Sequence, residues 1–182
     1  MTVDVPRLRV ITREIPSVDE LLDYTTGYDP LFWSRRGDAM AGFGSVLHGD
    51  RAPAMPPESI PELADRWRAI ADAAEIDDPV GIPGTGLVGF GSFVFDPRSR
   101  RTNHIDIPDT LVGRRGGRSW ITRVLLADAP REEPEMPPRV PFGPHWSAAL
   151  GPGAMTAERY EDAVRRAIGA IEHRELDKDV LA

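Results

Sequence analysis

The sequence predicts an α+β fold, a twisted and mainly antiparallel sheet with packed helices. Three observations support this class. Short runs with the alternation of strands follow one another within residues 8–48 and 87–127, with turn residues between them. Residues 61–75 and 156–171 repeat apolar side chains at helical spacing. With 182 residues, of which 41% are hydrophobic, the chain is long enough and apolar enough to bury a core.

The first part of the chain is expected to contain strands and one short helix. Residues 8–15 alternate as a strand does, and the acidic first turn of residues 18–24 favours a short helix. Residues 31–35 and 40–48 are extended runs, and the turn residues 36–38 between them predict a hairpin.

Residues 50–57 are rich in proline and are expected to form a loop that leads into a helix over residues 61–75. Ser59 suits the N-cap of this helix, Pro61 its first turn and Glu62 the positive end of its dipole. Five of its residues share one apolar face: Leu63, Trp67, Ile70, Ala71 and Ala74.

The middle of the chain is expected to continue the sheet. A glycine-rich turn, a strand, a strand interrupted by Pro108 and a final strand follow in order: residues 81–86, 87–95, 103–112 and 119–127. In the first of these strands Leu87, Phe93 and Phe95 have the same parity and should point to one side. The basic, glycine-rich residues 113–118 predict the turn between the last two strands.

The last part of the chain begins with a proline-rich stretch, residues 130–144, which is expected to be an exposed linker or long surface loop. A helix follows, with Thr156 as its N-cap, and its apolar side chains repeat at Tyr160, Ala163, Val164, Ala167, Ile168 and Ile171. Residues 178–182 begin a strand. Because natural domains rarely end inside a strand, we expect the chain to be a truncated part of a larger fold.

Composition excludes several classes of function. The formal charge of −7 disfavours nucleic acid or an anionic membrane surface as a partner. The chain has no cysteine, which excludes disulfides, cysteine-based zinc sites and thiol nucleophiles. It also has no leader-like amino terminus and no apolar run near the roughly 18 residues of a membrane span, so we expect a cytoplasmic protein.

Gly84, Gly86 and Gly89 match the pattern GxGxxG of dinucleotide-binding proteins. That motif requires a helix to follow, because the phosphates bind the free amides at its N-terminus. Here the following residues are patterned as a strand. We therefore expect Gly89 and Gly91 to mark a bulge or a close backbone contact instead.

Histidines and arginines give weaker signals. His48, His104, His145 and His173 are scattered without the spacing of metal ligands, so no metal site is expected from them. Three arginine runs lie at predicted turns, where solvated charge is the ordinary explanation and an anion-binding patch is the alternative. The runs are Arg35 and Arg36; Arg98, Arg100 and Arg101; and Arg114, Arg115 and Arg118.

Lys178 is the single lysine among 22 basic residues. A desolvated lysine can lose its proton and act as a base or nucleophile, whereas arginine stays protonated. Lys178 is therefore a candidate catalytic residue, and the alternative is the chance survival of one exposed lysine.

The carboxyl-terminal residues 156–182 carry a more specific pattern. In the run TAERYEDAVRRAIGAIEHRELDKDVLA, ten residues match a helix of the form YxxAVxxAxxxIxxGExxK followed by a KVVLA-like strand. This pattern resembles the start of the catalytic region of chorismate-utilising enzymes, which include isochorismate synthase, salicylate synthase and the large chains of anthranilate and aminodeoxychorismate synthases. Residues 79–97 and 32–44 are similar, more loosely, to the amino-terminal sheet of isochorismate synthases.

The resemblance implies the amino-terminal portion of an isochorismate synthase, with a mainly β region over residues 1–150 and the first helix and strand of the catalytic region over 151–182. It implies chorismate as substrate, and Lys178 as the base that activates water for attack on C2 as the C4 hydroxyl leaves. A lysine base must be neutral near pH 7, which requires burial or a nearby cation to lower its pKa by about three units. Asp179 stands where the family usually has valine, and its carboxylate could oppose the lowering of the lysine pKa.

The resemblance places the other catalytic groups in the carboxyl-terminal half of the family's fold. These are the general-acid glutamate, the ligands of Mg²⁺ and the groups that bind the substrate's carboxylates. Residues 19–24 (DELLDY) lack the LLES-like motif of the amidotransferase-dependent members, so no glutamine amidotransferase partner is expected. Two alternatives stay open: salicylate synthase or another chorismate-utilising enzyme, and a non-catalytic binding or scaffold domain.

Overall fold

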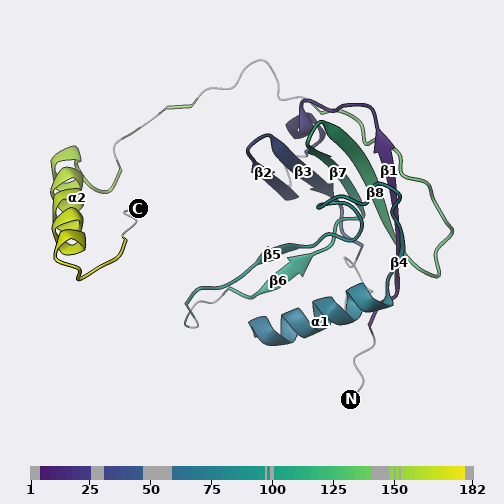
Figure 1. Ribbon diagram of the computed structural model, residues 1–182, viewed down its shortest axis with the longest axis horizontal. Coiled ribbons are helices and arrows are strands. Elements are labelled where there is room, and N and C mark those ends of the chain that lie inside the picture. Colours follow the sequence, from purple (N-terminus) through teal and green to yellow (C-terminus); the bar gives the residue numbers. More distant parts are fainter. Residues whose placement is uncertain are drawn as a thin grey trace. The chain divides into compact units, whose positions relative to one another are not determined.

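The computed structural model describes residues 5–25, 31–46, 59–96, 98, 101–140, 148–149, 151 and 153–178. The chain divides into two compact units, Met1–Phe142 and Gly143–Ala182. The first unit holds a mostly antiparallel sheet and one α-helix, and the second unit holds the other α-helix (Figure 1). The predicted α+β class with a mainly antiparallel sheet is confirmed.

The main sheet of the first unit has six strands in the order β2-β3-β7-β8-β1-β4. Neighbouring strands are antiparallel except β1 and β4, which are parallel. A separate hairpin pairs β5 with β6. The strands are β1 (Leu8–Ile15), β2 (Leu31–Arg35), β3 (Asp38–Phe43), β4 (Glu75–Asp77), β5 (Phe90–Ser92), β6 (His104–Asp106), β7 (Thr110–Arg115) and β8 (Arg118–Leu126).

The pair β1 and β8 forms the centre of the fold. Leu8, Val10 and Val124 lie on one face of this pair and are buried. On the same face the buried hydroxyls of Thr12 and Thr122 are hydrogen-bonded to each other at 2.9 Å. Because each hydroxyl finds a partner, the two polar groups can be buried at little cost.

Trp120 in β8 lies opposite Gly113 in β7, and its side chain is 1% exposed. A Cβ atom at position 113 would stand 2.3 Å from Cζ2 of the indole. The indole therefore occupies the space that a side chain at position 113 would need, which accounts for glycine there.

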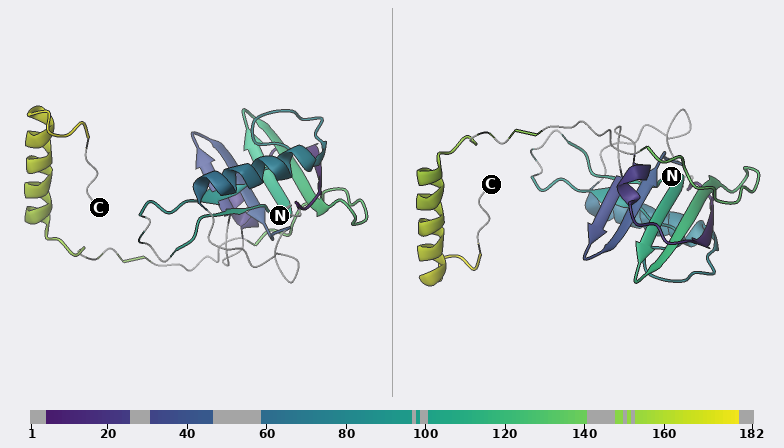
Figure 2. Two further views of the ribbon diagram at one scale, coloured as in Figure 1. Left: turned by 90° about the horizontal axis from the view of Figure 1, so that it is seen from below. Right: turned by 90° about the horizontal axis from the view of Figure 1, so that it is seen from above.

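Helix α1 (Ile60–Ala73) covers the face of the sheet that carries Leu8 and Val10 (Figure 2). Its N-terminus is a capping box, in which the Glu62 amide donates to Ser59 Oγ and the Ser59 amide donates to Glu62 Oε2 at 2.8 Å. The predicted cap and helix are confirmed. Ile70 is buried in the core beneath α1 and Trp67 is partly buried there, as the apolar face predicts.

The opposite face of the sheet is covered in part by a short 3₁₀ helix, η1 (Leu21–Tyr24). The sequence predicts a helix from residue 18, and this prediction is wrong for its first turn. The Val18 amide donates instead to the buried Ser119 Oγ of β8 at 3.1 Å, which holds residue 18 against the sheet. Val18 and Leu21 then pack on Ala41 of β3.

Residues 131–140, here called the strap, have no helix or strand, as expected for the proline-rich stretch. They are nevertheless held by ion pairs on the face of the sheet opposite α1. Glu133 pairs with Arg13 at 2.9 Å, and Arg131 pairs with Asp77 at 2.6 Å. The strap is therefore held to the first unit near both ends, since Arg139 also pairs with Asp23, and it is a long surface loop, one of the two predicted alternatives.

The strand predicted over residues 87–95 is much shorter, because only Phe90–Ser92 pair with β6. The Val94 amide donates to Asn103 Oδ1 at 2.7 Å, so a side chain takes the place of a backbone partner. Phe93 and Phe95 are exposed, and the expectation that they share a face with Leu87 in one strand is wrong. Gly89 allows the close contact with Ile105, whose Cγ2 would lie 2.6 Å from a Cβ there.

The second unit contains helix α2 (Ala157–Glu172), which begins at the predicted cap Thr156. It ends in a Schellman motif, in which the Glu175 amide donates to Ala170 O at 2.9 Å and the Arg174 amide donates to Ile171 O at 3.0 Å. Arg174 adopts the left-handed backbone this motif needs, with φ 60°. No helix within the described ranges is long and apolar enough to cross a membrane.

Candidate functional site

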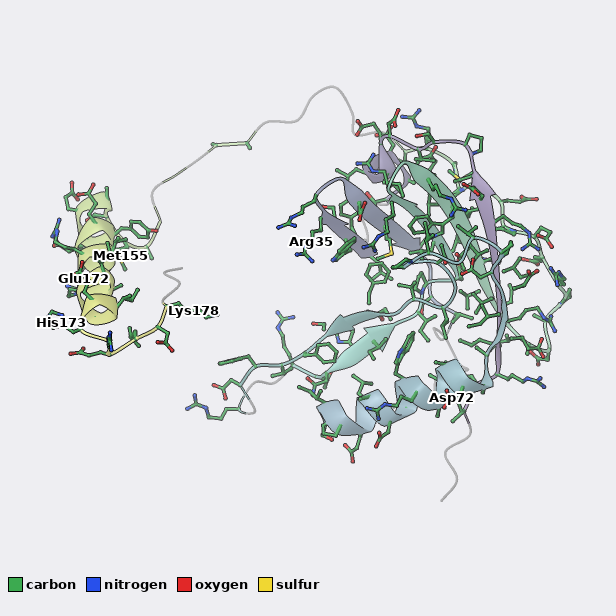
Figure 3. All side chains as sticks on the ribbon, in the orientation of Figure 1. Arg35, Asp72, Met155, Glu172, His173 and Lys178 are labelled. Atoms are coloured by element: carbon green, nitrogen blue, oxygen red, sulfur yellow. The ribbon has the colours of Figure 1, made fainter. Side chains whose placement is uncertain are left out.

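Lys178 lies in the second unit, six residues beyond the end of α2, and its side chain is exposed (Figure 3). The Schellman motif at Arg174 ends the helix and redirects the chain before Lys178. The strand expected over residues 178–182, including Asp179, falls almost wholly outside the described residues. The structure therefore defines how the chain reaches Lys178.

The grooves of the described surface include one in each unit. The larger, of about 950 Å³, runs along the N-terminal half of α2 beside Tyr160, and the smaller, of about 520 Å³, lies on the β5–β6 hairpin beside Phe93 and His104. Neither is lined by Lys178. The candidate base is thus not part of either of these two grooves.

The glycine-rich loop 81–86 does not form a phosphate site. The Val80 and Gly81 amides donate to Asp78 Oδ1, and the Gly86 amide donates to Thr12 Oγ1 at 3.2 Å. These amides are already engaged by Asp78 and by Thr12 of β1, and strand β5 follows the loop. The arrangement differs from a dinucleotide-binding motif, whose free amides begin a helix.

The histidines that the structure describes lie in different units. His104 in β6 faces Asp106, with Nε2 at 3.4 Å from the carboxylate, and His173 Nδ1 lies 2.7 Å from Gly169 O at the end of α2. His48 and His145 are outside the described residues. Among the described residues, no three His, Asp or Glu side chains converge as a metal site would require.

The structure brings two of the three arginine runs together. Because β3 pairs with β7, the turn between β2 and β3 lies beside the turn between β7 and β8. Arg114 Nε donates to Gly37 O at 3.0 Å, and Asp38 links the two turns by pairing with Arg115 at 3.4 Å. Two arginines of the third run, Arg98 and Arg101, lie between β5 and β6, where Arg98 pairs with Asp96 at 2.7 Å; Arg100 is outside the described residues.

Arg35 and Arg36 differ from the other described arginines of the first unit, because neither side chain has a hydrogen bond or ion pair with a described residue. Arg36 is also strained, with φ 53°, in a two-residue turn whose second residue is Gly37. Such turns prefer Asn-Gly, and a left-handed arginine costs about 1 kcal/mol. The sequence identified the run of Arg35 and Arg36. Only the structure shows that the arginines of the neighbouring turn have partners, whereas the side chains of Arg35 and Arg36 have none among the described residues.

The charged cluster under the strap has a structural role. Arg13 and Arg131 both donate to Asp77, and these hydrogen bonds, that of Arg13 first, hold the pKa of Asp77 below its ordinary value. Glu133 accepts from both arginines as well. Two cations and two anions therefore compensate each other, which leaves no unpaired acid for proton transfer.

Scans against protein-family models and searches of curated proteins and of solved structures found no match for this chain. The fold class is consequently established by the structure alone.

Proposed function

We propose that this chain is the amino-terminal portion of an isochorismate synthase, with Lys178 as the base that activates water. The observation that carries the proposal is the ten-residue pattern from Tyr160 to Ala182 that resembles the start of the chorismate-utilising catalytic region. The helix that this pattern requires is present as α2, capped at Thr156. The antiparallel sheet of the first unit supports an amino-terminal sheet region of the same kind.

The proposed reaction adds one water molecule to chorismate and removes another. Lys178 Nζ takes a proton from water, the oxygen bonds to C2, the ring double bonds shift, and the C4 hydroxyl leaves as water after protonation by an acid. The described chain supplies a candidate for the base alone. The resemblance assigns the acid and the substrate-binding groups to the region that follows this strand in the family.

The described residues do not form a site for Mg²⁺, which the family uses. Mg²⁺ prefers carboxylate oxygens in octahedral geometry. The close carboxylates Asp77 and Glu133 are compensated by Arg13 and Arg131, and no group of three possible ligands occurs among the described residues. The proposal therefore assigns no Mg²⁺ ligand and no step through Mg²⁺ to these residues.

A second candidate function is a non-catalytic scaffold or binding domain. The exposed position of Lys178, outside both grooves, favours this alternative. Salicylate synthase is the closest alternative within the family, because it forms isochorismate before eliminating pyruvate. Product analysis separates it from isochorismate synthase.

The test is chorismate turnover by the complete gene product with Mg²⁺, comparing the wild type with Lys178→Gln. We expect isochorismate as product and a loss of kcat of about 10²-fold or more in Lys178→Gln, because a general base contributes about that much. Arg174→Gln, an exposed cation in the same segment, is the matched control and should retain activity. Residues 1–182 alone are expected to be inactive.

Several results would contradict the proposal. The complete gene product could fail to convert chorismate, or Lys178→Gln could match the wild type. Turnover by residues 1–182 alone would show that the acid and metal ligands lie within this chain. Salicylate as the sole product would identify the enzyme as a salicylate synthase instead of an isochorismate synthase.

A further inference from the structure

Strand β2 is the last strand of the main sheet on one side. Its inner side pairs with β3 through five residue pairs, from Leu31–Gly42 to Arg35–Asp38. No strand among the described residues pairs with its outer side. The outward amides and carbonyls of β2 therefore form an edge to which another extended chain can add.

This edge ends in two positive charges that no described residue of the first unit compensates. Arg35 lies opposite Asp38 in the hairpin, but the Asp38 carboxylate is engaged by Arg115 at 3.4 Å and by the Gly116 amide at 3.3 Å. Arg35 extends from the end of β2 into solvent (Figure 3). Arg36 follows it at the turn, also without a partner among the described residues.

Trp33 adds an apolar contact to this edge. It lies two residues before Arg35, so both side chains are on the same face of β2, and it is 38% exposed. An indole beside a guanidinium suits a segment that alternates apolar and acidic residues. Aromatic residues and arginine are also the side chains most enriched at protein interfaces.

We propose that the outer edge of β2 is a docking site for an extended acidic segment of another protein chain. The segment would pair with β2 as an additional strand and place its carboxylates against Arg35 and Arg36. A second copy of this strand does not suit the site, because β2 has the sequence LFWSR and carries no acidic residue. Nucleic acid does not suit it, because the chain has a net charge of −7.

The turn sequence supports a role for the charge of Arg36. Gly116 and Gly117 adopt positive φ in the neighbouring turn at no steric cost, whereas Arg36 adopts φ 53° as a residue with a side chain. A strained residue whose side chain has no hydrogen bond or ion pair with a described residue supports a contact made outside the molecule.

To test the proposal, the full chain is titrated with a short synthetic peptide of alternating glutamate and valine. Binding is monitored by amide spectra of the β2 residues and by Trp33 fluorescence. Three controls separate charge from strand pairing: the same peptide with lysine for glutamate, one with proline at alternate positions, and pyrophosphate. We expect the glutamate peptide to shift the β2 signals and the three controls to bind at least about tenfold more weakly.

Two variants test the arginines directly. Arg35→Gln and Arg36→Asn should each weaken peptide binding about two- to fivefold, as the loss of one exposed ion pair does. Arg36→Asn creates the preferred Asn-Gly turn, so its stability should equal or exceed that of the wild type. Arg68→Gln on α1, an exposed arginine whose ion-pair partner is Asp65, should leave binding unchanged.

Each of three results would overturn the proposal. The first is the absence of shifts in β2 up to about 1 mM glutamate peptide. The second is equal binding of the proline peptide, which would exclude strand pairing. The third is equal binding of pyrophosphate with loss in Arg35→Gln, which would make the arginines a simple anion site.

Discussion

Helices α1 and α2 are both amphipathic, are 14 and 16 residues long, and both begin at a hydroxyl cap. Helix α1 nevertheless buries Leu63 and Ile70, whereas α2 buries none of its residues. An apolar stripe thus predicts that a helix forms, but not what covers the stripe. The partner of α1 comes from strands that are distant in the sequence, and α2 has no such partner among the described residues of its own unit.

The largest expected effect comes from removing the apolar contact of each helix. Ile70→Ala should lower the free energy of unfolding of the first unit by about 2–5 kcal/mol, because it leaves a cavity between α1 and β1. The matched change in α2, Ile168→Ala, should alter that free energy by less than about 0.5 kcal/mol, because Ile168 is 51% exposed. Urea unfolding followed by tryptophan fluorescence measures both. Equal losses would show that α2 packs on the first unit.

A smaller effect is expected from the caps. Ser59→Ala should cost the first unit about 1 kcal/mol, because the Glu62 amide loses its acceptor. Thr156→Ala removes the corresponding bond to the Arg159 amide, and should lower the helix content of α2 without moving the unfolding midpoint of the first unit. Circular dichroism of the two variants decides between these outcomes. A shift of the unfolding midpoint of the first unit in Thr156→Ala would contradict this expectation.

The smallest effect is a dependence on pH shared by the two helices. Hydrogen bonds from the Ser59 amide and hydroxyl hold the pKa of Glu62 below its ordinary value of 4.5, and backbone and Thr156 hydrogen bonds do the same for the pKa of Glu158. A carboxylate with a lowered pKa in the folded state stabilises that state above its ordinary pKa. This stabilisation should be lost as the pH falls through the lowered pKa. Helix content measured against pH should lose part of this dependence in Glu62→Gln and in Glu158→Gln, and identical curves in wild type and variants would refute the assignment.

Local signals predicted much of this fold. Ser59 and Thr156 were sufficient to locate the start of each helix, and the alternation of β1 and β8 located the central strands. Strand β4 was not predicted, because Glu75–Asp77 is too short to show a period. It pairs with β1 in parallel, where Glu75 also meets Arg7 at 2.8 Å. The ion pairs of the strap were not predicted either, since they join residues far apart in sequence.

The candidate sites show the same limit. Lys178 was identified from the composition and from a local sequence pattern. Both signals can be read from the sequence alone. The position of Arg35 and Arg36 at an edge depends on the order of strands, and their lack of partners depends on Asp38 pairing with Arg115. Neither property can be predicted from the residues that flank Arg35 and Arg36 in the sequence.

The contact between Trp120 and Gly113 has a consequence for how this sequence can change over generations. Any side chain at position 113 meets the indole, with a Cβ only 2.3 Å from Cζ2. A descendant can therefore lose the glycine only after Trp120 has been replaced by a smaller residue. That first replacement opens a cavity and costs about 3–5 kcal/mol when it is to alanine. Substitutions at positions 113 and 120 must therefore occur in a fixed order, with Trp120 replaced first. The protein with only that first substitution is less stable than the present one.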